Sequence, residues 1–500
     1  MTRASWSSRV RVCAAACVMA AVGTASAHFA MPTDLPVSRV ITNLEAKANE
    51  KPSATAYLNL ARAHAYAFSH GTGMIPVLGG DDMQVYEIGY SPSRPNGPMP
   101  PIGEKMTREQ ALEHLRAGVR AFNDAIKLDR RDAVAVYGLA CLLEAGQSMA
   151  GEVGVMPMVD VQPVSEWNAR SAESLVRTLA ERDATDEEIG LSSERSWSGD
   201  RERPRALAWA LVRARSGATG KHLERINATM ARLWSVETYE LYFEAFCLGL
   251  PEDSGATEKG ILHLNSYVSY QAAEDYSRVV PTKYNYPVRK ATIAAAMKAF
   301  EKLPPCGAIT PIVVPLEGHI DASGDVPIEH LLARDVRVKF DLDGTGRDQT
   351  WSWVSPRGGL LCWDPSNRGT ISGGMQLFGS ATWWLLFEDG YAAMDALDDD
   401  RDGVLTGREL DGLSLWVDAN TNGVSEPGEV KPLATFNITR LSTRADKSAR
   451  ASDGRSLVCE QGVTFASGRV APTYDWVTTP MVGNADRDAA AASIGASGKD

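Results

Sequence analysis

Apolar residues in the first half of the chain recur at the spacing of amphipathic helices. The clearest apolar face consists of Leu112, Leu115, Val119, Phe122 and Ile126. These residues are three or four positions apart, so they share one face of a helix with 3.6 residues per turn. Thr107 and Gln110 stand at the two positions of an N-terminal capping box. The pattern therefore predicts a helix that begins just after Thr107.

Further helical patterns fill most of this half. They cover residues 133–146, 164–181, 204–215, 221–234, 236–248 and 287–302. Pro204 stands in the first turn of its segment, where a helix tolerates proline. A glycine- and proline-rich insertion at 69–106 interrupts the helices. It is either a lid over a ligand or an ordinary surface excursion.

Small and large apolar residues recur here at the spacing of a helical-hairpin repeat. One copy reads Phe122-x-x-Ala125-Ile126-x-Leu128-Asp129, then Ala133-x-x-Val136-Tyr137-x-Leu139-Ala140-x-x-Leu143. An earlier copy reads Ala54-x-x-Tyr57-x-x-Leu60-Ala61-x-x-His64. The pattern resembles the tetratricopeptide repeat, although Arg130 and Lys51 replace its usual terminating proline. The resemblance implies a concave surface for a protein or peptide, and a generic α-helical domain is the alternative.

The second half of the chain is patterned as strands. Apolar residues alternate with polar ones at Val336, Val338 and Phe340, and again at Trp351 and Trp353. This change begins near Pro304, where proline-rich and β-branched segments replace the helical pattern.

These patterns predict two domains with different secondary structure. We expect an α-helical, tetratricopeptide-like domain over 28–310 and a β-rich domain of mixed α and β content over 311–482. Residues 483–500 are rich in alanine, glycine and serine, which predicts a disordered tail.

The most specific signal is a pattern of alternating oxygen-bearing residues that occurs twice. Residues 398–409, here called loop 1, read Asp-Asp-Asp-Arg-Asp-Gly-Val-Leu-Thr-Gly-Arg-Glu. Residues 418–429, loop 2, read Asp-Ala-Asn-Thr-Asn-Gly-Val-Ser-Glu-Pro-Gly-Glu. Both satisfy the EF-hand calcium-loop pattern in full. Two matches so close together predict Ca²⁺ binding, and an acidic, solvated turn is the alternative.

The spacing assigns a ligand to each position of the two loops. In loop 1 the ligands would be Asp398, Asp400, Asp402, the Val404 carbonyl, Thr406 and Glu409. In loop 2 they would be Asp418, Asn420, Asn422, the Val424 carbonyl, Glu426 and Glu429. Loop 2 has two neutral amides among its early ligands, and Ser425 replaces the apolar Leu405 of loop 1. We therefore expect loop 2 to bind Ca²⁺ more weakly.

The loops stand too close together to form two complete helix–loop–helix hands. Residues 410–417 are the whole connection, and a helix of that length spans only about 12 Å. Leu413, Leu415 and Val417 alternate, which predicts a short strand that leads into loop 2. We expect two EF-like loops in series.

The segment from Val336 to Thr443 resembles the calcium-binding modules of secreted bacterial proteins, of the haemolysin-type and dockerin-like classes. The resemblance is carried by Phe340 to Gly344, Leu377 to Gly379, Asp389 to Tyr391, both loops and Trp416 to Asp418. It implies Ca²⁺ binding outside the cytoplasm and no particular reaction. Asp341 and Asp343 would begin a third ion loop that has no glutamate at its twelfth position, so ion binding there stays open.

The first 27 residues have the pattern of a secretory signal peptide. A basic region with Arg3, Arg9 and Arg11 precedes an apolar stretch at 12–22 and the small residues Ala25-Ser26-Ala27. The apolar stretch is too short to be a transmembrane segment. We expect cleavage after Ala27 and a secreted or periplasmic protein.

Charge and cysteine usage narrow the class of protein further. The formal net charge is −12, and residues 395–429, with ten acidic residues and two arginines, contribute −8 of it. This local field attracts divalent cations and argues against nucleic acid as a partner. Beyond the signal segment the cysteines are Cys141, Cys247, Cys306, Cys362 and Cys459. Their spacing fits no zinc site, and their disulfide pairing stays open.

No catalytic motif of the common hydrolase or nucleotide-binding types occurs in the sequence. We therefore expect a calcium-binding protein and not an enzyme, with Ca²⁺ held structurally and the helical domain as an interaction surface. Two alternatives stay open: a secreted hydrolase with structural calcium, and a calcium-dependent adhesion module of the dockerin-like kind. Trp351, Trp353, Trp383 and Trp384 would stack on sugars in the first alternative, although such residues more often lie in the core.

Overall fold

The structure is a computed structural model. It describes residues 32–70, 74–77, 106–155, 166–186, 188–189, 202–250, 264–281, 287–300, 308–321, 324, 326–344 and 348–481. The expected signal peptide, most of the 69–106 insertion, the C-terminal tail and Cys306 lie outside the described residues.

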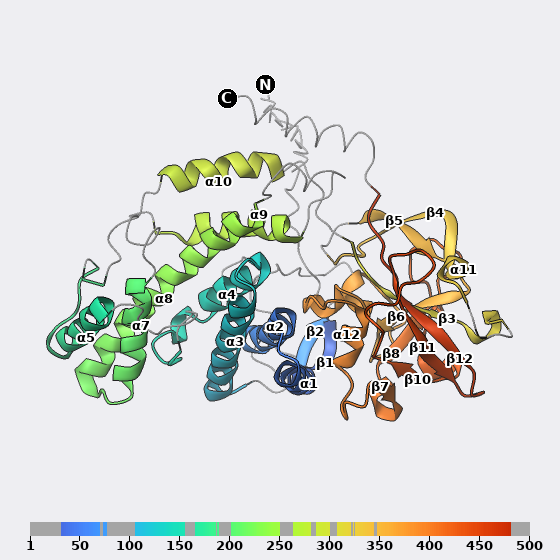
Figure 1. Cartoon of the computed structure of the whole chain (residues 1–500), viewed down its shortest axis with the longest axis horizontal. Coiled ribbons are helices and arrows are strands. Elements are labelled where there is room, and N and C mark those ends of the chain that lie inside the picture. Colours follow the sequence, from blue (N-terminus) through green and yellow to red (C-terminus); the bar gives the residue numbers. More distant parts are fainter. Residues whose placement is uncertain are drawn as a thin grey trace, which may run out of the picture.

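Helices make up the N-terminal half and strands dominate the C-terminal half, so the chain combines α and β structure (Figure 1). The helices are α1 (Val37–Glu50), α2 (Ala54–His70), α3 (Arg108–Leu128), α4 (Ala133–Ala145), α5 (Glu166–Glu181), α7 (Glu202–Arg215), α8 (Gly220–Gly249), α9 (Leu264–Val279) and α10 (Pro287–Phe300). A small antiparallel pair, β1 (Pro32–Pro36) and β2 (Met74–Val77), brackets α1 and α2 in the sequence.

Helix α3 begins where the capping box predicts. Thr107 accepts a hydrogen bond from the backbone N–H of Gln110, and the Gln110 side chain accepts one from the Thr107 backbone. Leu115, Val119 and Phe122 are buried, as their spacing predicts. Phe122 packs so closely on Gly138 of α4 that an added Cβ there would lie 2.6 Å from its ring. The small residue therefore sets the approach of the two helices.

One predicted helix boundary is wrong. We expected separate helices over 221–234 and 236–248, but α8 runs unbroken from Gly220 to Gly249. Between the two segments stands Ser235, and neither proline nor glycine interrupts the chain there. A serine inside a helix lowers stability only slightly, so packing of the long helix against α4 and α9 decides its continuity.

The C-terminal half is built on an eight-stranded antiparallel sheet with the order β7-β10-β11-β12-β3-β6-β8-β9. Its strands are β3 (Ile312–Pro315), β6 (Gly358–Trp363), β7 (Val404–Thr406), β8 (Leu413–Trp416), β9 (Val430–Pro432), β10 (Ile438–Ser442), β11 (Leu457–Phe465) and β12 (Val470–Asp475). A separate hairpin joins β4 (Leu332–Phe340) and β5 (Gln349–Val354). Short helices include α11 (Ile328–Leu331) and α12 (Gly390–Asp395).

The predicted strands around 336–340, 351–353 and 413–417 are present as β4, β5 and β8. Their aromatic residues form a cluster, with Phe340, Trp353 and Trp416 packed at ring separations of 5.3–5.5 Å. Trp353 and Trp416 are fully buried. Edge-to-face packing of this kind joins the hairpin to the strand that leads into loop 2.

Two further findings concern the cysteine thiols and the length and apolar character of the helices. Cys141, Cys362 and Cys459 are buried thiols that take part in no disulfide within the described part of the chain. Among the described helices, none has the length and apolar character needed to cross a membrane.

A histidine pair joins α2 to α3. The Nδ1 atoms of His64 and His114 lie 3.0 Å apart, so one ring must donate a hydrogen bond and the other accept it. Burial, and then the proximity of His114, lower the pKa of His64 from 6.5 to about 4. Burial also lowers the pKa of His114. The fold therefore favours the neutral rings.

Stability of the helical half should fall on acidification because of this pair. Above pH 6.5 His64 is neutral in both folded and unfolded chains, whereas between pH 6.5 and about pH 4 only the unfolded chain takes up its proton. The full loss is about 3 kcal/mol by the usual conversion. Urea unfolding followed by circular dichroism over this pH range measures it, and His64→Leu should flatten the dependence. An equally steep dependence in the variant would contradict this assignment.

Candidate metal centre

Loop 1 is positioned by a short helix on one side and a strand on the other. Helix α12 starts at the N-cap Asp389, which accepts a hydrogen bond from the Ala392 N–H at 2.8 Å, and its Gly390 N–H donates to Asp475 at 2.9 Å. After the loop, β7 pairs with β10. Gly403 turns the chain at φ 89°, a conformation that favours glycine.

Three carboxylates of loop 1 converge on one point. Asp398, Asp400 and Glu409 each offer an oxygen atom, and these atoms lie within 4.8 Å of one another. Asp398 is only 1% exposed. Its Oδ2 accepts the Gly403 N–H at 2.8 Å, whereas its Oδ1 has no hydrogen-bond partner within the described part of the chain. A buried carboxylate oxygen without a donor requires a cation or a proton to stabilise it.

Glu409 closes the loop from its last position. Its Oε1 accepts the Asp399 N–H at 2.8 Å, and its Oε2 accepts the Thr406 N–H at 3.0 Å. The last ligand position is therefore joined to the backbone just after the first one. This arrangement holds the Glu409 carboxylate close to Asp398.

The other predicted ligands of loop 1 lie outside this triad. Asp402 is exposed, and its Oδ1 accepts the Val404 N–H at 2.9 Å. Thr406 and Glu409 stand at the two capping-box positions of a short 3₁₀ turn. Asp402 is thus not one of the three gathered carboxylates, and the Val404 carbonyl and Thr406 keep their expected places in the order of the loop.

Loop 2 folds in the same way, but its oxygens already have donors. Asp418 is 1% exposed. Its Oδ2 accepts hydrogen bonds from Trp353 Nε1 at 2.6 Å and from the Gly423 N–H at 2.7 Å, and its Oδ1 accepts the Asn422 N–H at 3.2 Å. No oxygen of this buried carboxylate is left without a donor.

The remaining predicted ligands of loop 2 bond to one another or to the backbone. The side-chain amides of Asn420 and Asn422 donate to Glu426 at 2.8 and 3.3 Å. Glu429 accepts the Ala419 N–H at 2.9 Å. The Val424 side chain is exposed. Binding of an ion would have to replace several of these hydrogen bonds, which supports the expectation of a weaker site.

The loop that begins at Asp341 and a turn at residues 364–369 differ from loop 1. Asp343 accepts a hydrogen bond from the Gln349 side chain at 2.6 Å, and Asp341 belongs to no group of three or more gathered acids among the described residues. Asp364 uses both oxygens to accept the N–H groups of Arg368 and Gly369, so it shapes a turn by itself.

The electrostatic setting distinguishes the neighbouring acids Asp398 and Asp399. Burial raises the pKa of Asp398 above its ordinary value, against the hydrogen bonds of the loop backbone. Burial acts in the same direction on Asp399, but hydrogen bonds from Arg39 and Asn43 hold its pKa below the ordinary value. Asp399 therefore stays ionised beside a carboxylate that the fold does not compensate.

The residues of α1 that contact loop 1 could not be predicted from the sequence. Arg39, Asn43 and Lys47 of α1 contact the loop or the residues that lead into it. They are separated from it by some 350 residues, and no local pattern marks them. They carry only the ordinary periodicity of an amphipathic helix.

Comparison with known proteins places both loops inside a recognised module. Residues 320–478 match the model of a family described as the SPM domain. The match covers most of the β-rich half and none of the helices α1–α10. No curated protein matches the chain.

A pair of glycines offers a test of how tightly loop 1 is built. Both Gly403 and Gly407 have positive φ, but an added Cβ would lie 2.1 Å from Arg444 Nε only at Gly403, with open space at Gly407. Gly403→Ala should therefore lower the free energy of unfolding by at least about 1 kcal/mol more than Gly407→Ala does. Chemical unfolding in the presence of a chelator measures the difference. Equal effects would mean that Arg444 moves away without cost.

Proposed function

We propose that this protein binds Ca²⁺ in loop 1 as a structural ion, with loop 2 as a weaker second site. The observation that carries the proposal is the buried Asp398, whose Oδ1 lacks a donor among the described residues and whose carboxylate lies close to those of Asp400 and Glu409. A cation at this point would stabilise all three carboxylates at once.

The donor set favours Ca²⁺ over other metals. All gathered groups are carboxylate oxygens, which suit hard cations and offer nothing to soft ones. Ca²⁺ accepts six to eight oxygens in a flexible geometry, whereas Mg²⁺ demands a tighter octahedron. Asp402, the Val404 carbonyl and Thr406 stand at the positions of the sequence pattern that would supply further ligands.

Charge repulsion gives the ion a structural role. Five aspartates lie within eight positions, and Arg401 is the only basic residue among them. The aspartates are Asp395, Asp398, Asp399, Asp400 and Asp402. Without a cation these groups oppose the compact loop, and an ion that binds only the folded loop stabilises it by mass action. Extracellular modules of this type bind Ca²⁺ at about 10⁻⁴ to 10⁻³ M. This range suits permanent occupancy outside the cytoplasm, the location that the N-terminal pattern predicts.

The helical half would then present the surface for a protein or peptide. This part of the proposal depends on the resemblance to tetratricopeptide repeats. For the hydrolase alternative, the described tryptophans 351, 353, 383 and 384 are buried in the core and give no support to sugar stacking. We therefore keep a calcium-stabilised binding protein as the proposed function.

Calorimetric titration of the full chain with Ca²⁺ tests the proposal. Asp398→Asn with Glu409→Gln should abolish the tighter binding event, because it removes two charges while it keeps the shape of the side chains. Asp418→Asn with Glu429→Gln, at the matching positions of loop 2, should leave that event in place. Tryptophan fluorescence reports on loop 2 in parallel, since Trp353 donates directly to Asp418.

Absence of binding at millimolar Ca²⁺ would refute the proposal. Equal loss in both double variants would instead show that the loops act as one unit. A titration with Mg²⁺ is the control for ion selectivity, and it should give a weaker response.

A further inference from the structure

Helix α1 from the helical half docks directly on loop 1. Arg39 donates from Nε to Asp399 Oδ1 at 2.8 Å and from Nη2 to the Leu397 carbonyl at 2.8 Å. Asn43 donates to the Ala396 carbonyl at 3.1 Å and to Asp399 Oδ1 at 2.9 Å. Two of these hydrogen bonds hold the backbone just before Asp398, the first ligand position of the loop, and the other two hold the side chain of Asp399 just after it.

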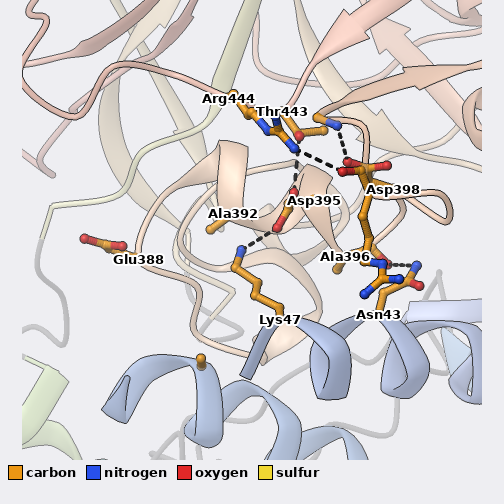
Figure 2. Close-up of polar contacts among 12 residues, drawn as sticks. Asn43, Lys47, Glu388, Ala392, Asp395, Ala396, Asp398, Thr443 and Arg444 are labelled. Carbon is orange, nitrogen blue, oxygen red and sulfur yellow. Dashed lines mark hydrogen bonds and ion pairs between the residues drawn. The ribbon is translucent and has the colours of Figure 1, made fainter. Parts of the chain in front are cut away.

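A second chain of contacts reaches the turn of the same loop. Figure 2 shows Lys47 of α1 pointing at Asp395, with Thr443 on the other side of that carboxylate. The Lys47–Asp395 ion pair measures 2.8 Å, and the Thr443 hydroxyl donates to Asp395 at 3.2 Å. The Thr443 N–H donates to the Gly403 carbonyl at 3.0 Å. Helix α1 is thus linked to both the entry and the turn of loop 1.

These contacts are more than incidental surface pairs. Asn43 is 8% exposed and Thr443 is 5% exposed, so their hydrogen bonds are shielded from water. Two of the donors from α1 bind the main-chain carbonyls of Ala396 and Leu397, directly before the first ligand position of loop 1. A rearrangement of loop 1 that displaces these two residues would remove the acceptors from α1.

We propose that α1 and the ion in loop 1 form a calcium-dependent clamp between the two halves of the protein. The clamp rests on the proposed function, because it requires Ca²⁺ in loop 1. An ion fixes Asp398 and Glu409 and so holds residues 396–399 in the form that α1 binds. By thermodynamic linkage, docking of α1 must strengthen ion binding by the same factor.

Substitution of the neutral residue Asn43 distinguishes this coupling from a change in the electrostatic field at the ion. Arg39 and Lys47 are positive, so their removal changes the field at the ion as well as the contacts. Asn43→Ala removes two hydrogen bonds and no charge. The matched control is Asn227→Ala in α8, whose half-buried side chain accepts a hydrogen bond from Arg215 inside the helical half.

Calcium titration of the full-length variants tests the clamp from the side of the ion. Asn43→Ala should weaken binding at loop 1 about tenfold, within the usual range of coupling between sites, and Asn227→Ala should leave it unchanged. Unchanged affinity in Asn43→Ala would overturn the clamp while the proposed function stands. A wild-type chain that does not bind Ca²⁺ would overturn both.

Hydrogen exchange tests the clamp by its effect on the helix, and it needs no variant of α1. In the wild-type chain Ca²⁺ should slow amide exchange in residues 37–50, which contain no predicted ligand. Helix α5, which packs on α7 and α8, is the internal control and should keep its rate. The Asp398→Asn, Glu409→Gln variant should lose the effect. Ion binding in calorimetry without slower exchange in α1 would overturn the clamp alone.

Discussion

Main-chain carbonyls in two turns of the β-rich half lie buried against the helical half and must find donors there. Asn59 of α2 donates to the carbonyls of Leu385 and Leu386 at 2.6 and 3.0 Å, and Arg62 donates to the Trp384 carbonyl at 2.6 Å. The donors on α1 serve the carbonyls of residues 396 and 397 in the same manner. Because an unsatisfied buried carbonyl costs about 1–3 kcal/mol, the two halves are fitted to each other through these groups.

The turn at residues 383–386 shows what this docking stabilises. Trp383, Trp384 and Leu386 all have positive φ, between 49° and 62°, which is strained for residues with large side chains. Their side chains compensate by packing: the ring of Trp383 lies among Trp363, Phe378 and Phe387. Hydrogen bonds from α2 hold the carbonyls of the same turn. A strained backbone persists only when its surroundings define it this closely.

Around loop 1 the same interface acts on charge as well as on shape. Arg39 and Lys47 each pair with an acid that the sequence pattern does not assign to the ion, Asp399 and Asp395. The predicted ligands Asp398, Asp400 and Glu409 remain for a cation (Figure 2 shows Asp398 beside these contacts). The acidic segment is therefore divided between two acids that pair with basic residues of α1 and three predicted ligands that are left for the ion we propose. This division explains how so many carboxylates are tolerated in one short stretch.

The features that follow from local chemistry could be predicted from the sequence. The capping box at Thr107 and the strand before loop 2 depend on neighbouring residues, and the structure contains both. The twelve-residue pattern also identified loop 1 before any contact was known. Its two copies look alike in sequence, but Asp418 Oδ1 accepts the Asn422 N–H of its own loop, and Trp353, which is 65 residues away, adds a second donor to Oδ2.

What the tertiary structure decided has a common physical reason. The continuity of α8, the pairing of His64 with His114 and the docking of α1 on loop 1 all depend on groups far apart in the chain. An amphipathic pattern indicates that one face of a helix is buried, but it does not indicate which element packs against that face. The sequence by itself thus determined many of the segments and the two candidate loops, and only the packing of one half on the other determined which of those loops the helices hold.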